Sequence, residues 1–393
     1  MTVNDQTRVL FASPAAANGD AFIEVPVAYD ALVLASFGGP EGQDDVIPFL
    51  RNVTRGRGIP DERLEEVAHH YRHFGGVSPI NEHNRALRSA LEGELAARGI
   101  DLPVYWGNRN WGPYLDEAFA QAADDGHSTL LVLATSAYSS YSSDRQYRED
   151  IAEAITKAGL EDRVTADKVR LYFDHPGFVQ PFQEGVNSAV RGFLDEGIAA
   201  SDIHVLFSTH SIPTADAERS GPRDVEFGEG GAYVAQHRAV AAHVIEHLGS
   251  AAGGESVPWQ LVYQSRSGPP SQPWLEPDIN DVIAELPAAG AKAVVIVPLG
   301  FVSDHMEVMW DLDTEAMETA AEVSLPAVRT PTPGVHPAFV AGLIDLVVER
   351  IEGTPEAERP HVTALGPWYD VARPADCENV RLGFKPAAAG ILP

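Results

Sequence analysis

The stretch Ala31-Leu32-Val33-Leu34-Ala35-Ser36-Phe37, closed by Gly38-Gly39-Pro40, decides the fold of this chain. It is a short, continuous apolar run bounded by turn residues, which is typical of a parallel strand buried on both faces. Further apolar runs of similar length follow along the chain, at residues 104–106, 130–134, 169–173, 204–208, 260–263 and 293–299. These runs predict a series of buried parallel strands.

Helical patterns lie between the predicted strands. Within residues 81–98, Leu87, Leu91 and Leu95 recur at intervals of four, and Gly99 follows as a stop signal. Similar patterns occupy residues 115–123, 147–158, 178–194, 234–248 and 338–351. Strands that alternate with helices predict an α/β fold with right-handed crossovers.

The two halves of the chain resemble each other, because each has apolar strands that end in polar loops. We therefore expect two similar, doubly wound, Rossmann-like domains. The expected divisions are an irregular extension at 1–29, a first domain at 30–170 completed by a helix at 336–352, a second domain at 171–335, and a loosely packed Pro/Ala-rich tail at 353–393. Ligands of such sheets bind beyond the carboxyl ends of the strands, so two facing ends predict a cleft.

Composition narrows the class of function. The 393 residues include 57 acidic and 28 basic side chains, and the net charge of −29 argues against nucleic acid or an anionic membrane as partner. Cys377 is the single cysteine, which excludes an intramolecular disulfide and fits a reducing compartment. No apolar run approaches the roughly 20 residues of a membrane span, and no secretory signal is visible. We expect a soluble cytoplasmic protein without integral membrane contact.

One histidine stands at the end of a predicted strand, in Phe207-Ser208-Thr209-His210-Ser211-Ile212-Pro213. The strand delivers His210 to its carboxyl end, where small hydroxyl residues leave space beside the ring. A histidine in such a place is a general base or a metal ligand. The alternative is a side chain that only caps the loop.

A row of carboxylates follows the last predicted strand. Glu307, Asp311 and Glu315 are spaced by four residues, so a helix would align all three on one face. Neighbouring carboxylates repel each other unless a cation or protons intervene, and hard divalent cations prefer oxygen ligands. A solvated acidic face is the alternative, although Val308 and Trp310 indicate a half-buried helix.

A locally basic stretch is unusual in so acidic a chain. Arg51, Arg55 and Arg57 lie within residues 51–60, which contain no acidic side chain. Guanidinium groups pair well with carboxylates, so the stretch suits an acidic substrate. A surface loop with scattered arginines explains the pattern equally well.

Taken together, the motifs resemble those of the ferrochelatases, which insert ferrous iron into a porphyrin, and most closely the actinobacterial coproporphyrin ferrochelatases. The resemblance runs from about Ala31 to about Ile351. It rests on the ordered appearance of Ser36-Phe37-Gly38-Gly39-Pro40, Phe74-Gly75-Gly76-Val77-Ser78-Pro79, Ser208-Thr209-His210-Ser211-Ile212-Pro213, Gln264-Ser265 with Pro273-Trp274-Leu275, and Gly300-Phe301-Val302-Ser303-Asp304-His305-Met306-Glu307.

The resemblance implies a porphyrin cleft between the two domains and a role for each matching residue. His210 and Glu307 become the inner metal and proton-transfer site, and Asp311 and Glu315 the acidic positions that lead from it to the surface. The implied substrate-binding residues are Arg55, near the porphyrin propionates, with Phe37, Ser78, Arg57 and Tyr138. Fe²⁺ and porphyrin are then substrates, no cofactor is permanently bound, and the next enzyme of the haem pathway is a transient partner.

The chain departs from the family pattern at three places. One is the segment after Gly221-Pro222, which carries the Gly-rich stretch Phe227-Gly228-Glu229-Gly230-Gly231 and concerns the local loop geometry, not the reaction. Many actinobacterial members hold a [2Fe–2S] cluster on four cysteines, whereas here Asp144 stands at the first of these positions and Cys377 alone remains in the tail. We therefore expect no cluster. Phe37 stands where some coproporphyrin enzymes place an iron-ligating tyrosine, and a phenyl ring cannot ligate iron.

Iron insertion into coproporphyrin III, with release of two protons, is the preferred function because four propionates suit the basic stretch. Iron insertion into protoporphyrin IX stays open, as do a cobalt, nickel or magnesium chelatase and a non-catalytic tetrapyrrole-binding protein. The presence of both His210 and Glu307 favours catalysis.

Overall fold

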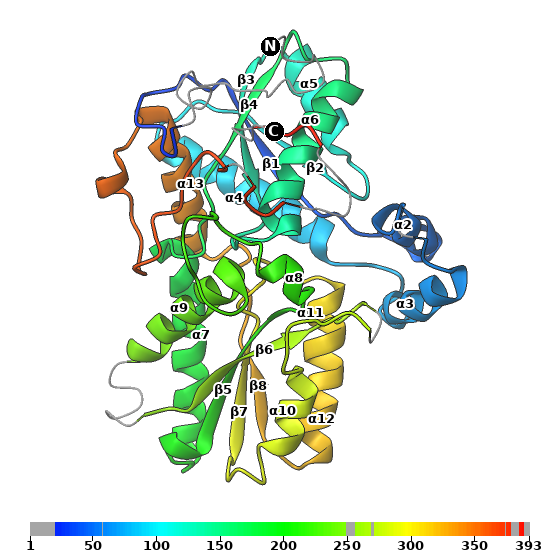
Figure 1. The fold of residues 1–393 in the computed structure, drawn as a ribbon, viewed down its shortest axis with the longest axis vertical. Helices are drawn as coiled ribbons and strands as arrows, with labels where there is room; N and C mark the ends of the chain where they lie inside the picture. Colours follow the sequence, from blue (N-terminus) through cyan, green and yellow to red (C-terminus); the bar gives the residue numbers. More distant parts are fainter. Residues whose placement is uncertain are drawn as a thin grey trace.

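The computed structural model describes residues 20–56, 58–248, 256–268, 271–373, 375–378 and 385–388. Two parallel, four-stranded sheets lie one above the other in Figure 1. The upper sheet has the order β2-β1-β3-β4, formed by β1 (Ala31–Ser36), β2 (Val104–Asn108), β3 (Thr129–Ala134) and β4 (Thr165–Lys168). The lower sheet has the equivalent order β6-β5-β7-β8, formed by β5 (Ile203–His210), β6 (Trp259–Gln264), β7 (Ala293–Val297) and β8 (Ala327–Arg329). The shared strand order confirms the prediction of two similar α/β halves.

Helices cover both sheets. Those that accompany the first sheet are α2 (Val46–Val53), α3 (Asp61–His73), α4 (Ile80–Ala97), α5 (Leu115–Asp124) and α6 (Gln146–Lys157). Those that follow are α7 (Pro176–Asp195), α8 (Thr214–Ala217), α9 (Gly231–Glu246), α10 (Ile279–Glu285), α11 (Met306–Trp310), α12 (Met317–Glu322) and α13 (Pro337–Glu352). In Figure 1, α2 and α3 project to the side of the first sheet. Among the described helices, none combines the length and apolarity needed to cross a membrane.

Alternate residues of each strand pack into different apolar clusters, as expected for strands covered on both faces. Leu34 of β1 and Phe207 of β5 belong to one cluster that extends through both halves. Val33, on the opposite face of β1, packs with α5 and α6, and Leu206 packs with α10 to α12. The two halves therefore share a continuous core.

Helix α13 joins the halves, because it packs against α4 of the first and α7 of the second. Its contact with α7 is close enough to require glycine. A Cβ atom on Gly177 would lie 2.4 Å from the carbonyl oxygen of Ala338 and 2.9 Å from the Cα of Gly342. The division of the chain into domains at 30–170 and 171–335 stays a prediction.

One strand lies earlier than we predicted. We expected a strand at residues 169–173, whereas β4 spans Thr165–Lys168. The strand is hard to see in the sequence because two of its four residues are charged and buried. Asp167 pairs with Arg350 at 2.8 Å, and Lys168 pairs with Asp144 at 3.1 Å. The partners lie far away in sequence, so the local pattern did not reveal them.

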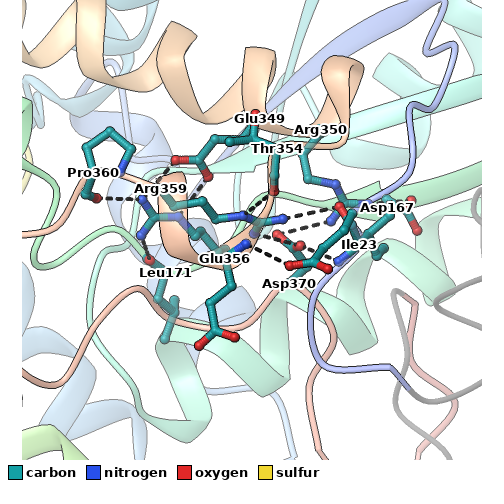
Figure 2. Close-up of polar contacts among 12 residues, drawn as sticks. Ile23, Asp167, Leu171, Glu349, Arg350, Thr354, Glu356, Arg359, Pro360 and Asp370 are labelled. Atoms are coloured by element: carbon teal, nitrogen blue, oxygen red, sulfur yellow. Dashed lines mark hydrogen bonds and ion pairs between the residues drawn. The ribbon is translucent and has the colours of Figure 1, made fainter.

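The prediction of a loosely packed tail is wrong for its described part. Arg359 and Asp370 are fully buried and form an ion pair of 2.8 Å, shown in Figure 2. Asp370 also accepts a hydrogen bond from the backbone N–H of Ile23 at 2.9 Å and lies 3.3 Å from Arg350. Residues 20–30 form no helix or strand, as expected, but Ile23 is buried beneath the tail. The tail lacks an apolar periodicity in its sequence. Its buried charged side chains attach it to the rest of the protein instead, through Arg350 and Ile23.

Candidate active site

His210 is the last residue of β5, an interior strand of the second sheet. Its backbone carbonyl accepts a hydrogen bond from the Tyr233 hydroxyl of α9 at 2.8 Å. The ring Nδ1 lies 2.5 Å from the Ser211 carbonyl oxygen, which only accepts, so Nδ1 carries a proton and donates it. Nε2 is the ring nitrogen that approaches Glu307.

Glu307 is brought to the same place by the loop after β7. Gly300 in this loop passes close to β5, and a Cβ atom there would lie 2.2 Å from Oγ1 of Thr209. The loop ends at His305, whose Nδ1 accepts a hydrogen bond from the Glu307 backbone N–H at 3.2 Å and caps α11. The Glu307 Oε1 then lies 3.7 Å from Nε2 of His210.

His210 and Glu307 form an ion pair that is partly open to solvent. Burial alone favours a neutral imidazole, but the Glu307 charge outweighs it and raises the pKa of His210 to about 9. Burial also opposes ionisation of Glu307, but the charge of His210 lowers the pKa of that carboxyl to about 2. The side chains are 31% and 47% exposed, so water screens the attraction. Near neutral pH the imidazole is therefore protonated at both ring nitrogens, and the Glu307 carboxylate is ionised.

Asp311 lies beside this pair and is held from β6. The Gln264 amide donates to the Glu307 backbone carbonyl at 3.0 Å and to Asp311 Oδ2 at 3.3 Å. Ser265, at a left-handed φ of 60°, turns its hydroxyl onto the same carboxylate. Burial and the charge of Glu307 raise the pKa of Asp311 to about 7. The motif that contains Gln264 and Ser265 is visible in the sequence, but it does not indicate that these side chains hold Asp311.

The acidic row does not lie on a regular α-helix, which corrects our prediction. After α11 ends at Trp310, a π-helical turn spans Asp311–Ala316, and α12 follows it. The wider turn brings residues five apart together, so the indole Nε1 of Trp310 donates to Glu315 Oε1 at 2.9 Å. In the described part of the chain, no three His, Cys, Asp or Glu side chains gather closely enough to hold a metal ion.

Helix α3 of the first half supplies neighbours that sequence reasoning missed. The His70 ring stacks on Trp310, with centroids 4.1 Å apart and planes 7° apart. Burial raises the pKa of Tyr71, and the charges of Glu307 and Asp311 add to this effect. The run of histidines in α3 is visible in the sequence, but nothing local to it indicates which helix it faces.

The predicted substrate-binding residues occupy different surroundings. Phe37 follows β1 and is 39% exposed, with its ring edge-on to Phe49. Arg55 is exposed, whereas Ser78 is buried, and Arg57 lies outside the described residues. Tyr138 is also buried, and it stacks on His237 in the apolar core with centroids 3.6 Å apart. No described contact joins Tyr138 directly to His210 or Glu307.

The residues at the family's cluster position do not fit a [2Fe–2S] cluster. Asp144 is buried and pairs with Lys168 and Arg148, each at 3.1 Å. Cys377 is the only cysteine of the chain, and its thiol contacts Asp376 at 3.2 Å and Ser139 at 3.4 Å. Burial raises the pKa of this thiol well above its ordinary value, and a protonated thiol is not a ligand. One thiol and a paired carboxylate cannot replace four thiolates.

The family model for ferrochelatases matches residues 29–351, and the chain belongs to the ferrochelatase family. Within it, the chain is 65% identical to the coproporphyrin III ferrochelatase of Leifsonia xyli, over 98% of this chain and 100% of that protein. It is 56% identical to the coproporphyrin III ferrochelatase of Tropheryma whipplei, over 98% of each. Among solved structures, the sirohydrochlorin chelatase SirB of Bacillus subtilis, 13% identical, gives a TM-score of 0.46 over 85% of this chain and 100% of that one.

Proposed function

We propose that this chain inserts Fe²⁺ into coproporphyrin III to form coprohaem in haem biosynthesis. The observation that carries the proposal is the His210–Glu307 pair at the carboxyl end of β5, with Asp311 beside it. Metal insertion into a free porphyrin forms iron–nitrogen bonds and releases two pyrrole protons, so a proton acceptor and oxygen ligands are both needed. The relatives at 65% and 56% identity are coproporphyrin III ferrochelatases, which supports the same reaction.

In this proposal, Nε2 of His210 accepts a pyrrole proton, and Glu307 takes it onwards. The imidazole already holds a proton in its pair with Glu307, so it acts as a base only after that proton has left. Nε2 and Oε1 lie 3.7 Å apart, so this transfer requires the two atoms to approach to hydrogen-bond distance. The proton then leaves along the acidic side of the site.

We assign the metal route to the three carboxylates of the acidic row. Fe²⁺ is a divalent cation that oxygen ligands bind without retaining it as thiolates do. Glu315 and Glu307 are exposed, Asp311 between them is half-buried, and Glu307 is nearest to His210, so the row leads along the site towards His210. Since the three are not gathered into one ligand set, each is suited to passing the cation on.

The choice of coproporphyrin rests on charge and on one aromatic ring. A net charge of −29 repels a substrate with four propionates, so local cations must offset this field. Arg51 pairs with Asp61 at 3.2 Å, whereas the described side-chain hydrogen bond of Arg55 goes to the neutral Asn52 at 2.6 Å. The Arg55 charge is therefore available to a propionate, and the exposed ring of Phe37 offers an apolar surface to the macrocycle.

We also propose which cofactors, which compartment and which partner accompany the reaction. Fe²⁺ enters as a substrate, and we propose that no cofactor is permanently bound, because the donor set around Asp144 does not fit a cluster. We place the reaction in the cytoplasm, because a chain with a single cysteine fits a reducing compartment. We also propose that coprohaem is transferred to the next enzyme of the pathway.

The test is an anaerobic competition assay. Coproporphyrin III and protoporphyrin IX, at equal concentration, are incubated with Fe²⁺ and the protein, and the metallated products are separated and quantified. We expect coprohaem to predominate and Glu307→Gln to abolish its formation. Glu322→Gln, which makes the same change at an exposed position at the end of α12, is the matched control. Absence of any metallated product contradicts the proposal, and a predominance of protohaem contradicts its substrate.

A further inference from the structure

Trp310 connects the two halves of the chain at the edge of the site. It ends α11, and its ring lies flat on His70 of α3. His69 and His73 of α3 approach the same ring edge-on, with centroids 6.1 and 5.6 Å away. Phe74, which follows α3, completes the enclosure with its centroid at 6.5 Å. The indole is therefore fixed by side chains from the opposite half.

The same indole holds one carboxylate of the acidic row. Its Nε1 donates to Glu315 Oε1 at 2.9 Å, across the five-residue spacing of the π-helical turn. A regular α-helix, with 3.6 residues per turn, brings residues three and four apart together instead. The π-helical turn thus places Trp310 and Glu315 next to each other, and α3 holds the ring in place.

We propose that Trp310 is a positioning residue, which orients the Glu315 carboxylate for Fe²⁺ when α3 is seated on its ring and releases that carboxylate when α3 is not. The proposal rests on the proposed function, in which the acidic row carries the metal. An unrestrained glutamate loses the freedom of three side-chain torsions when it binds a cation. The hydrogen bond from the indole imposes this restriction in advance, and preorganisation of this kind strengthens binding.

The lobe formed by α2 and α3 is suited to acting as a unit in this arrangement. Phe49, Leu50 and Leu64 form an apolar cluster of its own, to which Trp310 does not belong. A substitution of Trp310 therefore removes no member of this cluster. Burial raises the pKa of Tyr71, next to His70, and the charges of Glu307 and Asp311 add to this effect, so the seated lobe lies close to the inner carboxylates.

Trp310→Phe is the informative variant, because it keeps an aromatic ring for His70 and removes the N–H donor. We expect the Fe²⁺ concentration for half-maximal rate to rise about three- to tenfold, the effect of losing one hydrogen bond, while kcat changes less than twofold. Porphyrin affinity, measured by fluorescence quenching, stays the same. Trp259→Phe is the matched control. Trp259 begins β6, at the end of the strand away from Gln264, and its ring packs against Phe207.

A double-mutant cycle separates positioning from packing. Glu315→Gln keeps an acceptor for the indole but removes the charge, and in this background Trp310→Phe is expected to add less than twofold. His70→Ala leaves both hydrogen-bonding groups in place but frees the ring, so it is expected to raise the Fe²⁺ requirement as well. If Trp310→Phe does not fold, His70→Ala tests the positioning role in its place.

Direct binding of Co²⁺ without porphyrin, measured by calorimetry, gives a readout that does not depend on turnover. We expect Trp310→Phe to weaken Co²⁺ binding by the same factor as it raises the Fe²⁺ requirement. Unchanged Fe²⁺ dependence and Co²⁺ binding in a folded variant overturn the positioning role while the wild-type protein still metallates porphyrin. A wild-type protein that does not metallate porphyrin overturns the proposed function first, and this inference with it.

Discussion

Replacement of Asp370 by leucine tests how the C-terminal segment is attached. Asp370 is fully buried and compensates two guanidinium groups, those of Arg359 at 2.8 Å and Arg350 at 3.3 Å. Arg350 keeps Asp167 at 2.8 Å when Asp370 is removed, but the other described hydrogen bonds of Arg359 go to backbone carbonyls, and its guanidinium otherwise lies over the ring of Phe22. The variant therefore leaves the charge of Arg359 buried and uncompensated.

Loss of one partner from a buried ion pair costs about 3–5 kcal/mol. The Ile23 backbone N–H also loses its acceptor, which adds about 1 kcal/mol. A matched surface pair provides the control: Arg373 and Asp224 lie 2.9 Å apart with side chains 43% and 63% exposed. Asp224→Leu is expected to change the free energy of unfolding by less than about 1 kcal/mol.

Urea denaturation followed by circular dichroism and tryptophan fluorescence measures both variants, and Trp368 lies two residues from the substitution. Replacing both partners, with Arg359→Met and Asp370→Leu together, is expected to recover most of the loss, because no charge remains unpaired. A free energy of unfolding for Asp370→Leu within about 1 kcal/mol of wild type refutes the reasoning. So does a double variant that is less stable than the single one.

Four further predictions concern the site. His210→Ala is expected to lower kcat about 10²- to 10⁴-fold while fluorescence titration shows unchanged porphyrin binding; wild-type turnover would remove His210 from the mechanism. Burial and Glu307 raise the pKa of Asp311 to about 7 in the folded protein, so the folded state binds that proton more tightly than the unfolded one. Ionisation of Asp311 therefore has no effect on stability below about pH 4, destabilises the folded protein increasingly up to about pH 7, and has a constant effect above that pH. Asp311→Asn is expected to raise the melting temperature of metal-free protein at pH 8 but not at pH 4. Equal shifts in melting temperature at both pH values would disprove the link between the raised pKa and stability. Arg55→Ala is expected to narrow the preference in kcat/KM for coproporphyrin III over protoporphyrin IX, and an unchanged ratio would place Arg55 outside the propionate site. Protein purified anaerobically is expected to lack acid-labile sulfide, and two sulfides per chain would show that a cluster forms on other ligands.

Apolar periodicity predicted the parts of the fold whose stability comes from local patterns. The strand at Ala31–Ser36 and the helix with Leu87, Leu91 and Leu95 lie where the sequence places them, within a residue or two. The pattern failed at β4 and in the tail, where Asp167 and Asp370 are buried charges whose ion-pair partners lie outside their own element. A buried charge looks like a surface charge until its partner is known.

Some residues of the candidate site could be predicted from local sequence patterns, and others could not. His210 and Glu307 were identified because each follows a strand that the sequence shows clearly, and the resemblance assigned them a role. The contacts around Trp310 were not predictable, because they depend on a π-helical turn and on a helix from the other half of the chain. The four-residue spacing of the carboxylates indicated a regular helix, and nothing in residues 311–316 marks the wider turn.

The position of α13 bears on how the chain is made on the ribosome. Leu87, Leu91 and Leu95 of α4 pack into the core cluster that includes α13, whose residues are translated some 240 positions after α4. At roughly 5–20 residues per second, the α4 surface waits on the order of ten seconds or more for its cover. The side of α4 that contacts α13 is therefore open to water during this interval. Nascent chains stalled before α13 should accordingly bind chaperones that recognise exposed leucine side chains, whereas full-length released chains should not.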